Sequence, residues 1–176
     1  MTSQVLYIVI VGLVAIERLA ELVIAKRNLA WSRRRGGHEV GFGHYPFMVV
    51  LHTGLLAGCL VEVGLGDRTF VPAVGWPMLG LVIAAQALRW WCIRTLGRQW
   101  NTRIVIVAGL TRVTGGPYRI FSHPNYVAVV VEGLALPLVH DAWITALVFT
   151  VLNAGLLTVR IRCENAALAG FAGAAT

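Results

Sequence analysis

Charged residues are scarce in this chain. Aspartate, glutamate, lysine and arginine make up only 13% of the 176 residues, whereas 57% are hydrophobic. A soluble domain carries about 25% charged residues, so this chain has too few charges to coat a water-soluble globule. The high apolar content also excludes an intrinsically disordered chain. The composition therefore predicts an integral membrane protein.

Cysteines are few, and familiar metal and cofactor motifs are missing. Cys59, Cys92 and Cys163 lie far apart in the sequence, which argues against a disulfide framework and indicates buried thiols. The five histidines show neither an HExxH motif nor paired Cys/His spacing, so we expect no metal site. The glycine pairs at 41 and 43 and at 64 and 66 lack the strand-to-helix context of a dinucleotide fingerprint, so a Rossmann domain is not expected.

Acidic residues are outnumbered by basic ones, 8 against 15, which gives a formal net charge of +7. The basic residues fall mainly in 26–35 and 94–119, beside apolar segments, and form no soluble face with interleaved aromatics. We therefore expect no nucleic-acid partner, but contact with anionic lipid head groups. The positive-inside rule places both basic segments and the C-terminus in the cytoplasm and the N-terminus outside.

Long apolar runs are what the chain has in abundance. Five segments, at about 5–25, 46–65, 70–91, 124–140 and 142–160, have lengths near the 20 or so residues that cross a bilayer as helix. The first run has no basic residue before it and no Ala-x-Ala site after it, so we interpret it as a span and not as a signal peptide. The predicted fold class is an all-α integral membrane protein with about five transmembrane helices, in one domain over 1–176.

One long polar segment, 92–125, precedes the last helical hairpin and is the natural place for a polar ligand. Within it, 103–108 reads RIVIVA, which fits either a short strand or an interfacial segment. The sequence His123-Pro124-Asn125-Tyr126 follows, and Pro124 suits the first position of the fourth helix. Such a helix N-terminus binds carboxylates or phosphates, or it is merely a cap beside a surface histidine.

Several charged positions within or beside the spans have two interpretations. Glu132 lies inside the fourth span, where an acid is costly: it is either functional, or it is paired with a nearby arginine or protonated against a neighbouring helix. Arg160 and Glu164 share one helix face after the fifth span, and on spacing alone a structural ion pair is favoured over a catalytic role. Glu17, Arg18 and Glu21 are expected to pair or snorkel near the cytoplasmic interface. Trp90, Trp91 and Trp100 are expected to form an interfacial aromatic belt.

Three ordered motifs resemble the signature of the isoprenylcysteine carboxyl methyltransferase family of integral-membrane methyltransferases. They are Gly116-Pro117-Tyr118-Arg119, His123-Pro124-Asn125-Tyr126, and the stretch from Arg160 to Asn165 with Leu168. Further stretches at 39–46, 51–52, 88–93 and 96–103 are similar to the bacterial branch associated with type III polyketide synthases. The chain departs from the family pattern at Ser122 and Asn165.

The resemblance implies S-adenosylmethionine as methyl donor, with S-adenosylhomocysteine as product, bound by a cytoplasmic segment of about 92–125 plus 160–169. It implies that the cofactor pocket is lined by Tyr118, His123, Pro124 and Tyr126. It also places Arg160 and Glu164 at the methyl-transfer end, with Glu132 as a second candidate base. The protein would then be a multi-pass component of a bacterial inner membrane, and its acceptor a lipid or lipophilic small molecule that enters from the bilayer.

The acceptor itself stays open among three chemical classes. These are a long-chain polyketide such as an alkylpyrone, a prenylcysteine-type carboxylate, and a phospholipid amine. A non-enzymatic small membrane carrier or assembly subunit is the competing class, although the chain shows no internal repeat of the kind that carriers often have.

Overall fold

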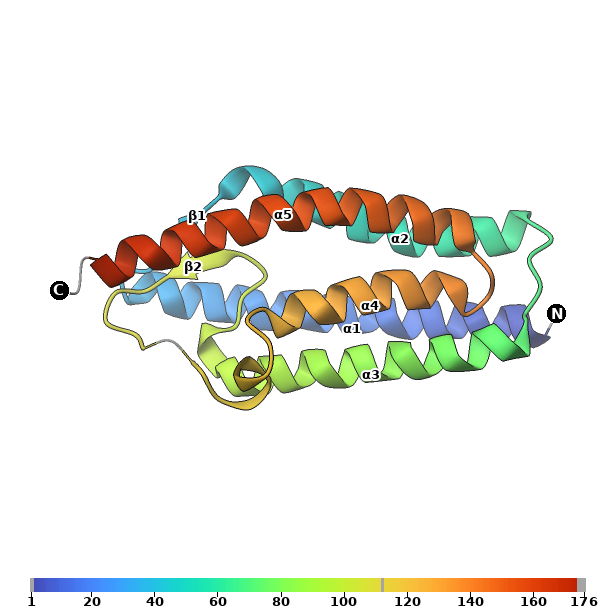
Figure 1. The fold of residues 1–176 in the computed structure, drawn as a ribbon, viewed down its shortest axis with the longest axis horizontal. Coiled ribbons are helices and arrows are strands. Elements are labelled where there is room, and N and C mark those ends of the chain that lie inside the picture. Colours follow the sequence, from blue (N-terminus) through green and yellow to red (C-terminus); the bar gives the residue numbers. More distant parts are fainter. Residues whose placement is uncertain (1, 112, 174–176) are drawn as a thin grey trace.

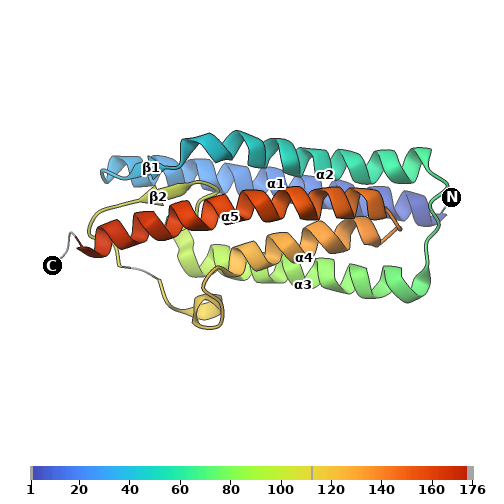
Figure 2. The same ribbon diagram turned by 45° about the horizontal axis from the view of Figure 1, so that its top comes forward.

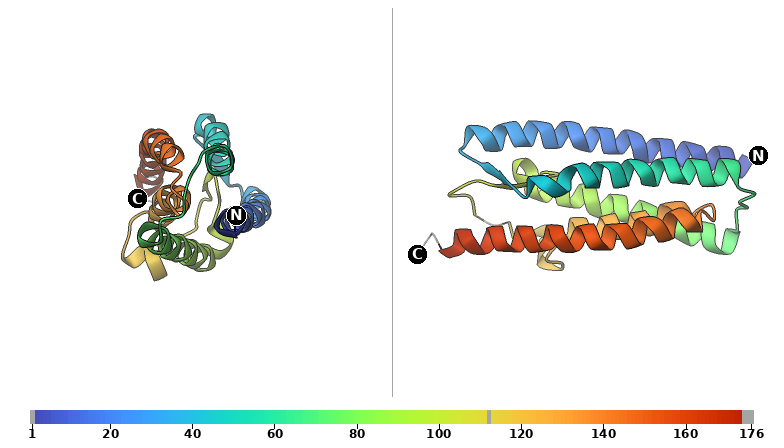
Figure 3. Two further views of the ribbon diagram at one scale, coloured as in Figure 1. Left: turned by 90° about the vertical axis from the view of Figure 1, so that its right-hand side faces the viewer. Right: turned by 90° about the horizontal axis from the view of Figure 1, so that it is seen from above.

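The computed structural model describes residues 2–111 and 113–173; Arg112 and the side chain of Leu168 lie outside the described part. Five long helices run lengthwise in the molecule (Figure 1). Their bounds are α1 Thr2–Arg34, α2 Tyr45–Leu65, α3 Pro72–Leu96, α4 Pro124–Leu138 and α5 Trp143–Gly173. Short 3-10 helices, η1 Phe42–His44, η2 Gly97–Gln99 and η3 Gly116–Arg119, lie in the connections. Seen end-on, the helices surround a common interior (Figure 3).

The helical bundle is built for a membrane. Among the described residues, α2, α3 and α5 are each long and apolar enough to cross a bilayer, and α4 is a shorter apolar helix. Large apolar side chains point outward along the bundle, among them Leu13, Phe47, Val50, Ile83 and Val151. In water this surface would aggregate, whereas lipid tails can cover it. The prediction of an all-α integral membrane protein is confirmed.

Three helices extend beyond the predicted spans, all at the same end of the bundle. α1 continues to Arg34 instead of ending near 25, α3 continues to Leu96, and α5 continues to Gly173. The predicted bounds follow the length of a membrane span, but the helices continue into the basic segments because lysine and arginine favour helix about as strongly as leucine does. α1 stops where Gly36 takes a positive φ of 74°, a conformation that favours glycine.

A two-stranded antiparallel sheet lies at that end of the molecule (Figure 2). β1, His38–Val40, pairs with β2, Ile104–Ile106, and Glu39 stands opposite Val105. The apolar run at 103–108 therefore contains a strand, the first of the two alternatives its sequence allows. An ion pair of 2.7 Å between Arg103 and Glu39 fixes the sheet. Burial acts to lower the pKa of Arg103, but its hydrogen bond and charge attraction to Glu39 raise it overall.

Trp100 belongs to the protein core and not to an interfacial belt. It is only 2% exposed and packs with Ala25 and Ile93. The Asn28 amide of α1 donates hydrogen bonds to the carbonyls of Gly97, at 3.1 Å, and Trp100, at 2.7 Å. These bonds hold the start of the polar segment against α1. The contact is possible because the chain reverses direction after α3.

Close helix packing depends on Gly133 of α4. A side chain added there would collide with the ring of Phe149 from α5. Small residues of this kind let membrane helices approach closely. Cys59 and Cys92 are buried and Cys163 is half-buried, and all three thiols are free.

Candidate active site

A partly open cavity of about 150 Å³ lies between the helices toward the end that carries the sheet; we call it the inner cavity. Its wall combines apolar side chains with polar ones from all five helices and from the connection after α3. The polar residues that line it are Arg18, Glu21, Tyr45, His52, Thr53, Arg89, Trp100, Thr102, Asn125, Tyr126, Asn153 and Arg160. A polar cavity inside a membrane bundle is a costly arrangement that favours a functional site.

Arg160 of α5 stands at the cavity wall, held by groups from three other parts of the chain. Its Nε donates to the Tyr126 hydroxyl at 2.8 Å, and one Nη donates to the Thr102 carbonyl at 2.7 Å. The other Nη lies 2.6 Å from the Met48 sulfur. The residue is only 6% exposed. A guanidinium held on three sides in this way is fixed in orientation, as a group that positions a reacting oxygen must be.

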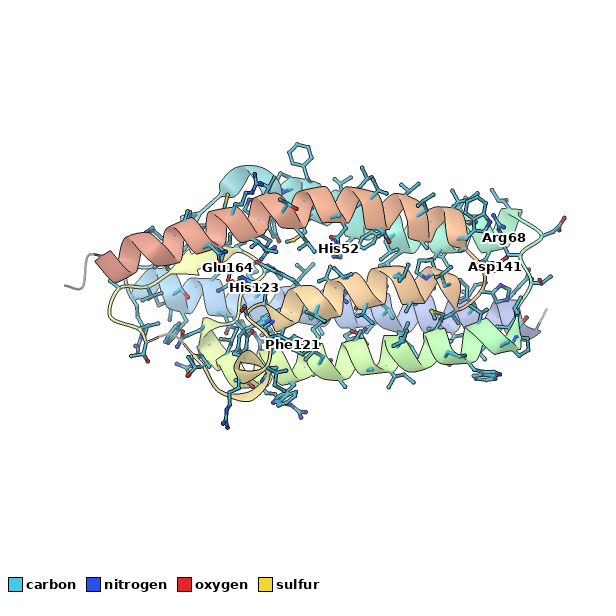
Figure 4. All side chains as sticks on the ribbon, in the orientation of Figure 1. His52, Arg68, Phe121, His123, Asp141 and Glu164 are labelled. Atoms are coloured by element: carbon cyan, nitrogen blue, oxygen red, sulfur yellow. The ribbon has the colours of Figure 1, made fainter. Side chains whose placement is uncertain are left out.

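Tyr126 connects Arg160 to Glu164. Its hydroxyl accepts the bond from Arg160 and donates to a Glu164 carboxylate oxygen. The His123 ring stacks on the Tyr126 ring, with centroids 5.2 Å apart and planes 13° apart. His123 Nδ1 lies 3.8 Å from the Glu164 carboxylate. We call His123, Tyr126, Arg160 and Glu164 the mouth cluster; Figure 4 shows His123 and Glu164 close together at the sheet end.

The spacing-based ion pair between Arg160 and Glu164 is wrong. The two side chains do share one face of α5, but each is bonded to the Tyr126 hydroxyl, and no direct ion pair joins them. The Arg160 guanidinium bonds instead to the Thr102 carbonyl and to Met48, which belong to other parts of the chain. Spacing along one helix contains no information about those neighbours.

Tyr118 and Pro124, the other two predicted cofactor residues, lie on the α3 side of the mouth cluster. The turn before Tyr118 fits tightly, because Gly116 has a φ of 56° and faces Thr95 of α3. Burial raises the pKa of Tyr118, and the neighbouring Cys92 thiol and the charge of Glu164 raise it further. Pro124 is buried at the first position of α4, as its sequence context predicts.

Glu132 belongs to a second set of charges, the buried ion cluster of Arg18, Glu21, Arg89 and Glu132. One Glu132 oxygen accepts from Arg89 at 2.5 Å and also from Arg18. Glu21 lies 2.6 Å from Arg18 and 3.3 Å from Arg89. Glu132 is therefore paired with arginine, as one of its two interpretations predicts, and two guanidiniums balance its charge.

Arg18 and Glu21 pair as expected but inside the bundle, not at an interface where they would snorkel. Both are among the residues that line the inner cavity. Glu17, one residue before Arg18, accepts hydrogen bonds from Gln86 and Trp90 of α3. The pairing thus ties α1 to α3 and α4.

Arg89 was missed as a site residue although it lies within the predicted span at 70–91, because an arginine near the end of a span is readily interpreted as a flanking charge. An arginine in one apolar segment and Glu132 in another were the available signal for their pairing. His52 and Asn153 were missed for a different reason: uncharged polar residues do not interrupt an apolar run when only charges are counted.

Fold and site together define a class of protein: an all-α integral membrane protein whose bundle encloses a polar cavity beside a cluster of histidine, tyrosine, arginine and glutamate. A family model for the isoprenylcysteine carboxyl methyltransferase (ICMT) family matches residues 78–170. The chain is also 34% identical over 160 residues to a Bacillus subtilis (strain 168) protein, "Uncharacterized protein YpbQ", covering 90% of this chain and 94% of the relative.

The chain belongs to the isoprenylcysteine carboxyl methyltransferase family. It is a membrane methyltransferase, and the matched region contains the mouth cluster, Arg89 and Glu132.

Proposed function

We propose that this protein is an S-adenosylmethionine-dependent O-methyltransferase that acts on a lipophilic acceptor. The observation that carries the proposal is the mouth cluster, which brings an oriented guanidinium and a carboxylate to a polar cavity inside the bundle. The acceptor is a long-chain polyketide such as an alkylpyrone, or a prenylcysteine-type carboxylate. The protein lies in a bacterial inner membrane with the mouth cluster at the cytoplasmic side.

The side chains near the mouth cluster fit this cofactor. S-adenosylmethionine offers a sulfonium, an ammonium, a carboxylate and a purine. The Glu164 carboxylate, 30% exposed, suits the cationic part, and the stacked rings of His123 and Tyr126 suit the purine or the sulfonium. Asn125, the residue before Tyr126, has a buried amide oxygen with no partner among the described residues, so a polar ligand atom can bond to it.

Bound S-adenosylmethionine would supply a methyl group on a positively charged sulfur. Arg160 would hold the acceptor oxygen in line, because its guanidinium lines the inner cavity and its other bonds fix its direction. Glu164, acting through the Tyr126 hydroxyl, would orient Arg160 or take a proton from an acceptor that has one. Exclusion of water by the apolar wall favours a transfer in which opposite charges cancel.

Calorimetry of S-adenosylhomocysteine binding to detergent-purified protein tests the cofactor half of the proposal. His123→Ala should weaken binding about tenfold, equivalent to about 1.4 kcal/mol. Glu62→Gln is the matched control, because Glu62 is a bonded carboxylate at the opposite end of the bundle, where it accepts from Thr145. Absence of binding to the wild-type protein would favour the non-enzymatic carrier or assembly subunit.

Incubation with methyl-labelled cofactor and a total lipid extract tests the acceptor half. Mass spectrometry of the labelled product separates an O-methylated polyketide from a methyl ester and from a methylated phospholipid amine. Arg160→Ala and Glu164→Gln should each lose turnover while remaining folded. Near wild-type rates in both variants would refute their assigned roles.

A further inference from the structure

The size of the inner cavity limits what it can hold. A cavity of roughly 150 Å³ in another protein accepts one benzene ring, and the inner cavity has about that volume. A whole S-adenosylmethionine molecule is several times larger than one ring. The cavity therefore suits a single six-membered ring of the acceptor, with the cofactor outside it at the mouth cluster.

Polar atoms that line the cavity have no partner. Asn153 of α5 is 3% exposed and Trp100 is 2% exposed, and both line the cavity. The Asn153 Oδ1 and the Trp100 Nε1 make no hydrogen bond with any described residue. A buried polar group without a partner costs about 1–3 kcal/mol, so these atoms indicate a ligand that bonds to them.

His52 of α2 adds a hydrogen-bond acceptor to the same cavity. Its Nδ1 lies 2.8 Å from the Met48 carbonyl oxygen, which can only accept, so Nδ1 carries the proton. The Nε2 of the neutral ring is then an acceptor, and no described residue bonds to it. The ring is held edge-on against Phe149, with centroids 5.4 Å apart, and lies within the bundle in Figure 4.

His52 and Asn153 lie at a similar depth, beyond Arg160. His52 follows Met48, which contacts Arg160, by one helical turn or about 6 Å. Asn153 precedes Arg160 on the same face of α5 by two turns, or about 10 Å. The two neutral acceptor atoms thus lie deeper in the cavity than Arg160, in the part that we call its inner end.

Two of the three arginines that line the same cavity are paired with carboxylates, and the third, Arg160, lies toward the mouth cluster. Arg18 and Arg89 are each paired with glutamates of the buried ion cluster. A carboxylate placed at the inner end would therefore find lone pairs on His52 and Asn153 and no unpaired cation there. A hydroxyl placed there would find acceptors.

We propose that the inner cavity is the ring pocket of the acceptor, and that His52 and Asn153 are specificity-determining residues that select a ring bearing a hydrogen-bond donor, such as a phenolic or enolic hydroxyl. His52 Nε2 accepts the hydrogen of this hydroxyl, which is not the oxygen that is methylated. The reacting oxygen of the ring points toward Arg160, and the alkyl chain lies toward the lipid. This inference rests on the proposed function and adds the residues that choose among acceptors.

Binding of two matched amphiphiles without cofactor tests the assignment directly. The probes are 4-nonylphenol, whose ring donates a hydrogen bond, and 4-nonylbenzoate, whose carboxylate cannot. His52→Leu should weaken 4-nonylphenol binding about tenfold and change 4-nonylbenzoate binding less than about twofold. His52→Gln keeps an acceptor oxygen and should retain 4-nonylphenol binding within about threefold.

Two more variants serve as controls for a loss of binding that is caused by misfolding. Asn153→Leu should also weaken 4-nonylphenol selectively, so the test stands if His52→Leu does not fold. His140→Leu replaces another buried histidine, which packs on Tyr7 and does not line the cavity, and should leave both probes unchanged. Equal 4-nonylphenol binding in wild-type and His52→Leu protein, or equal losses for both probes, would overturn the proposal.

The same samples separate this proposal from the proposed function. Failure of wild-type protein to bind S-adenosylhomocysteine would refute the methyl-transfer proposal while the amphiphile comparison still reports on the ring pocket. The other outcome is that the protein binds cofactor and transfers methyl groups, but substitution of His52 or Asn153 leaves 4-nonylphenol binding unchanged. This result would refute only the ring pocket.

Discussion

Removal of one charge from the buried ion cluster should destabilise the whole bundle. In Glu132→Gln, the shared acceptor for Arg18 and Arg89 becomes neutral, and both guanidiniums keep only Glu21. The Glu132 and Arg89 side chains are each 4% exposed, so water cannot replace the lost charge.

The magnitude follows from the geometry of the pairs. Two unit charges about 4 Å apart interact by about 4 kcal/mol at the effective dielectric constant of about 20 that suits protein sites. Glu132 faces two such charges, while Glu21 and the remaining amide oxygen offset part of the loss. Breaking a buried pair by removing one partner costs about 3–5 kcal/mol, and we expect Glu132→Gln to fall in that range.

Unfolding of the purified protein in mixed micelles, followed by circular dichroism, measures this free energy. Glu62→Gln is a matched carboxylate control: Glu62 pairs with Arg68 at 2.8 Å at the opposite end of the bundle, and the loss of this partly exposed pair should cost at most about 1 kcal/mol. The double variant Arg89→Met/Glu132→Met leaves the Arg18–Glu21 pair intact and should recover part of the stability. A Glu132→Gln protein as stable as wild type within about 0.5 kcal/mol would refute the reasoning. Normal stability with lost turnover would instead make Glu132 a catalytic base.

Three further outcomes are expected. Tyr126→Phe removes the hydroxyl that joins Arg160 to Glu164. Hydrogen bonds to charged groups contribute about 1.5–3 kcal/mol, so kcat in a methyl-transfer assay should fall about 10- to 100-fold while the protein stays folded. An unchanged kcat would contradict this. Gly133→Ala forces the ring of Phe149 to move and should cost about 1–3 kcal/mol, seen as a lower melting temperature; an unchanged melting temperature would show that α4 and α5 can separate freely. Burial, and then the charge of Arg160, lowers the pKa of His44, so unfolding takes up a proton below the ordinary histidine pKa of about 6.5. Wild-type stability should therefore fall as pH drops below about 6.5, and His44→Gln should flatten that decline in pH-dependent unfolding.

The structure brings four of the predicted site residues together in the mouth cluster, but their partners were not predictable from the sequence. The sequence motif around His123 and Tyr126 places both at the start of α4, and Arg160 and Glu164 follow from one helix face. The Tyr126 hydroxyl as their common partner requires α4 and α5 to pack side by side, as the hairpin between them allows. The Thr102 carbonyl reaches Arg160 only because the strand pairing brings the polar segment back across the bundle.

The inner cavity is the feature that was least predictable from the sequence. His52 and Asn153 each look like a single polar residue in an apolar helix. They can recognise a ligand only because both line the same cavity, and because His52 Nε2 and Asn153 Oδ1 have no hydrogen-bond partner among the described residues.

The sequence by itself determined the membrane environment, the all-α class and the family. Few charges and long apolar runs leave lipid as the only surrounding that such a surface tolerates, and ordered short motifs are properties of consecutive residues. The tertiary structure decided which charges pair, where the short sheet forms and where the cavity lies. These depend on contacts between residues far apart in the chain, such as Arg89 with Glu132, and helix packing alone sets those distances.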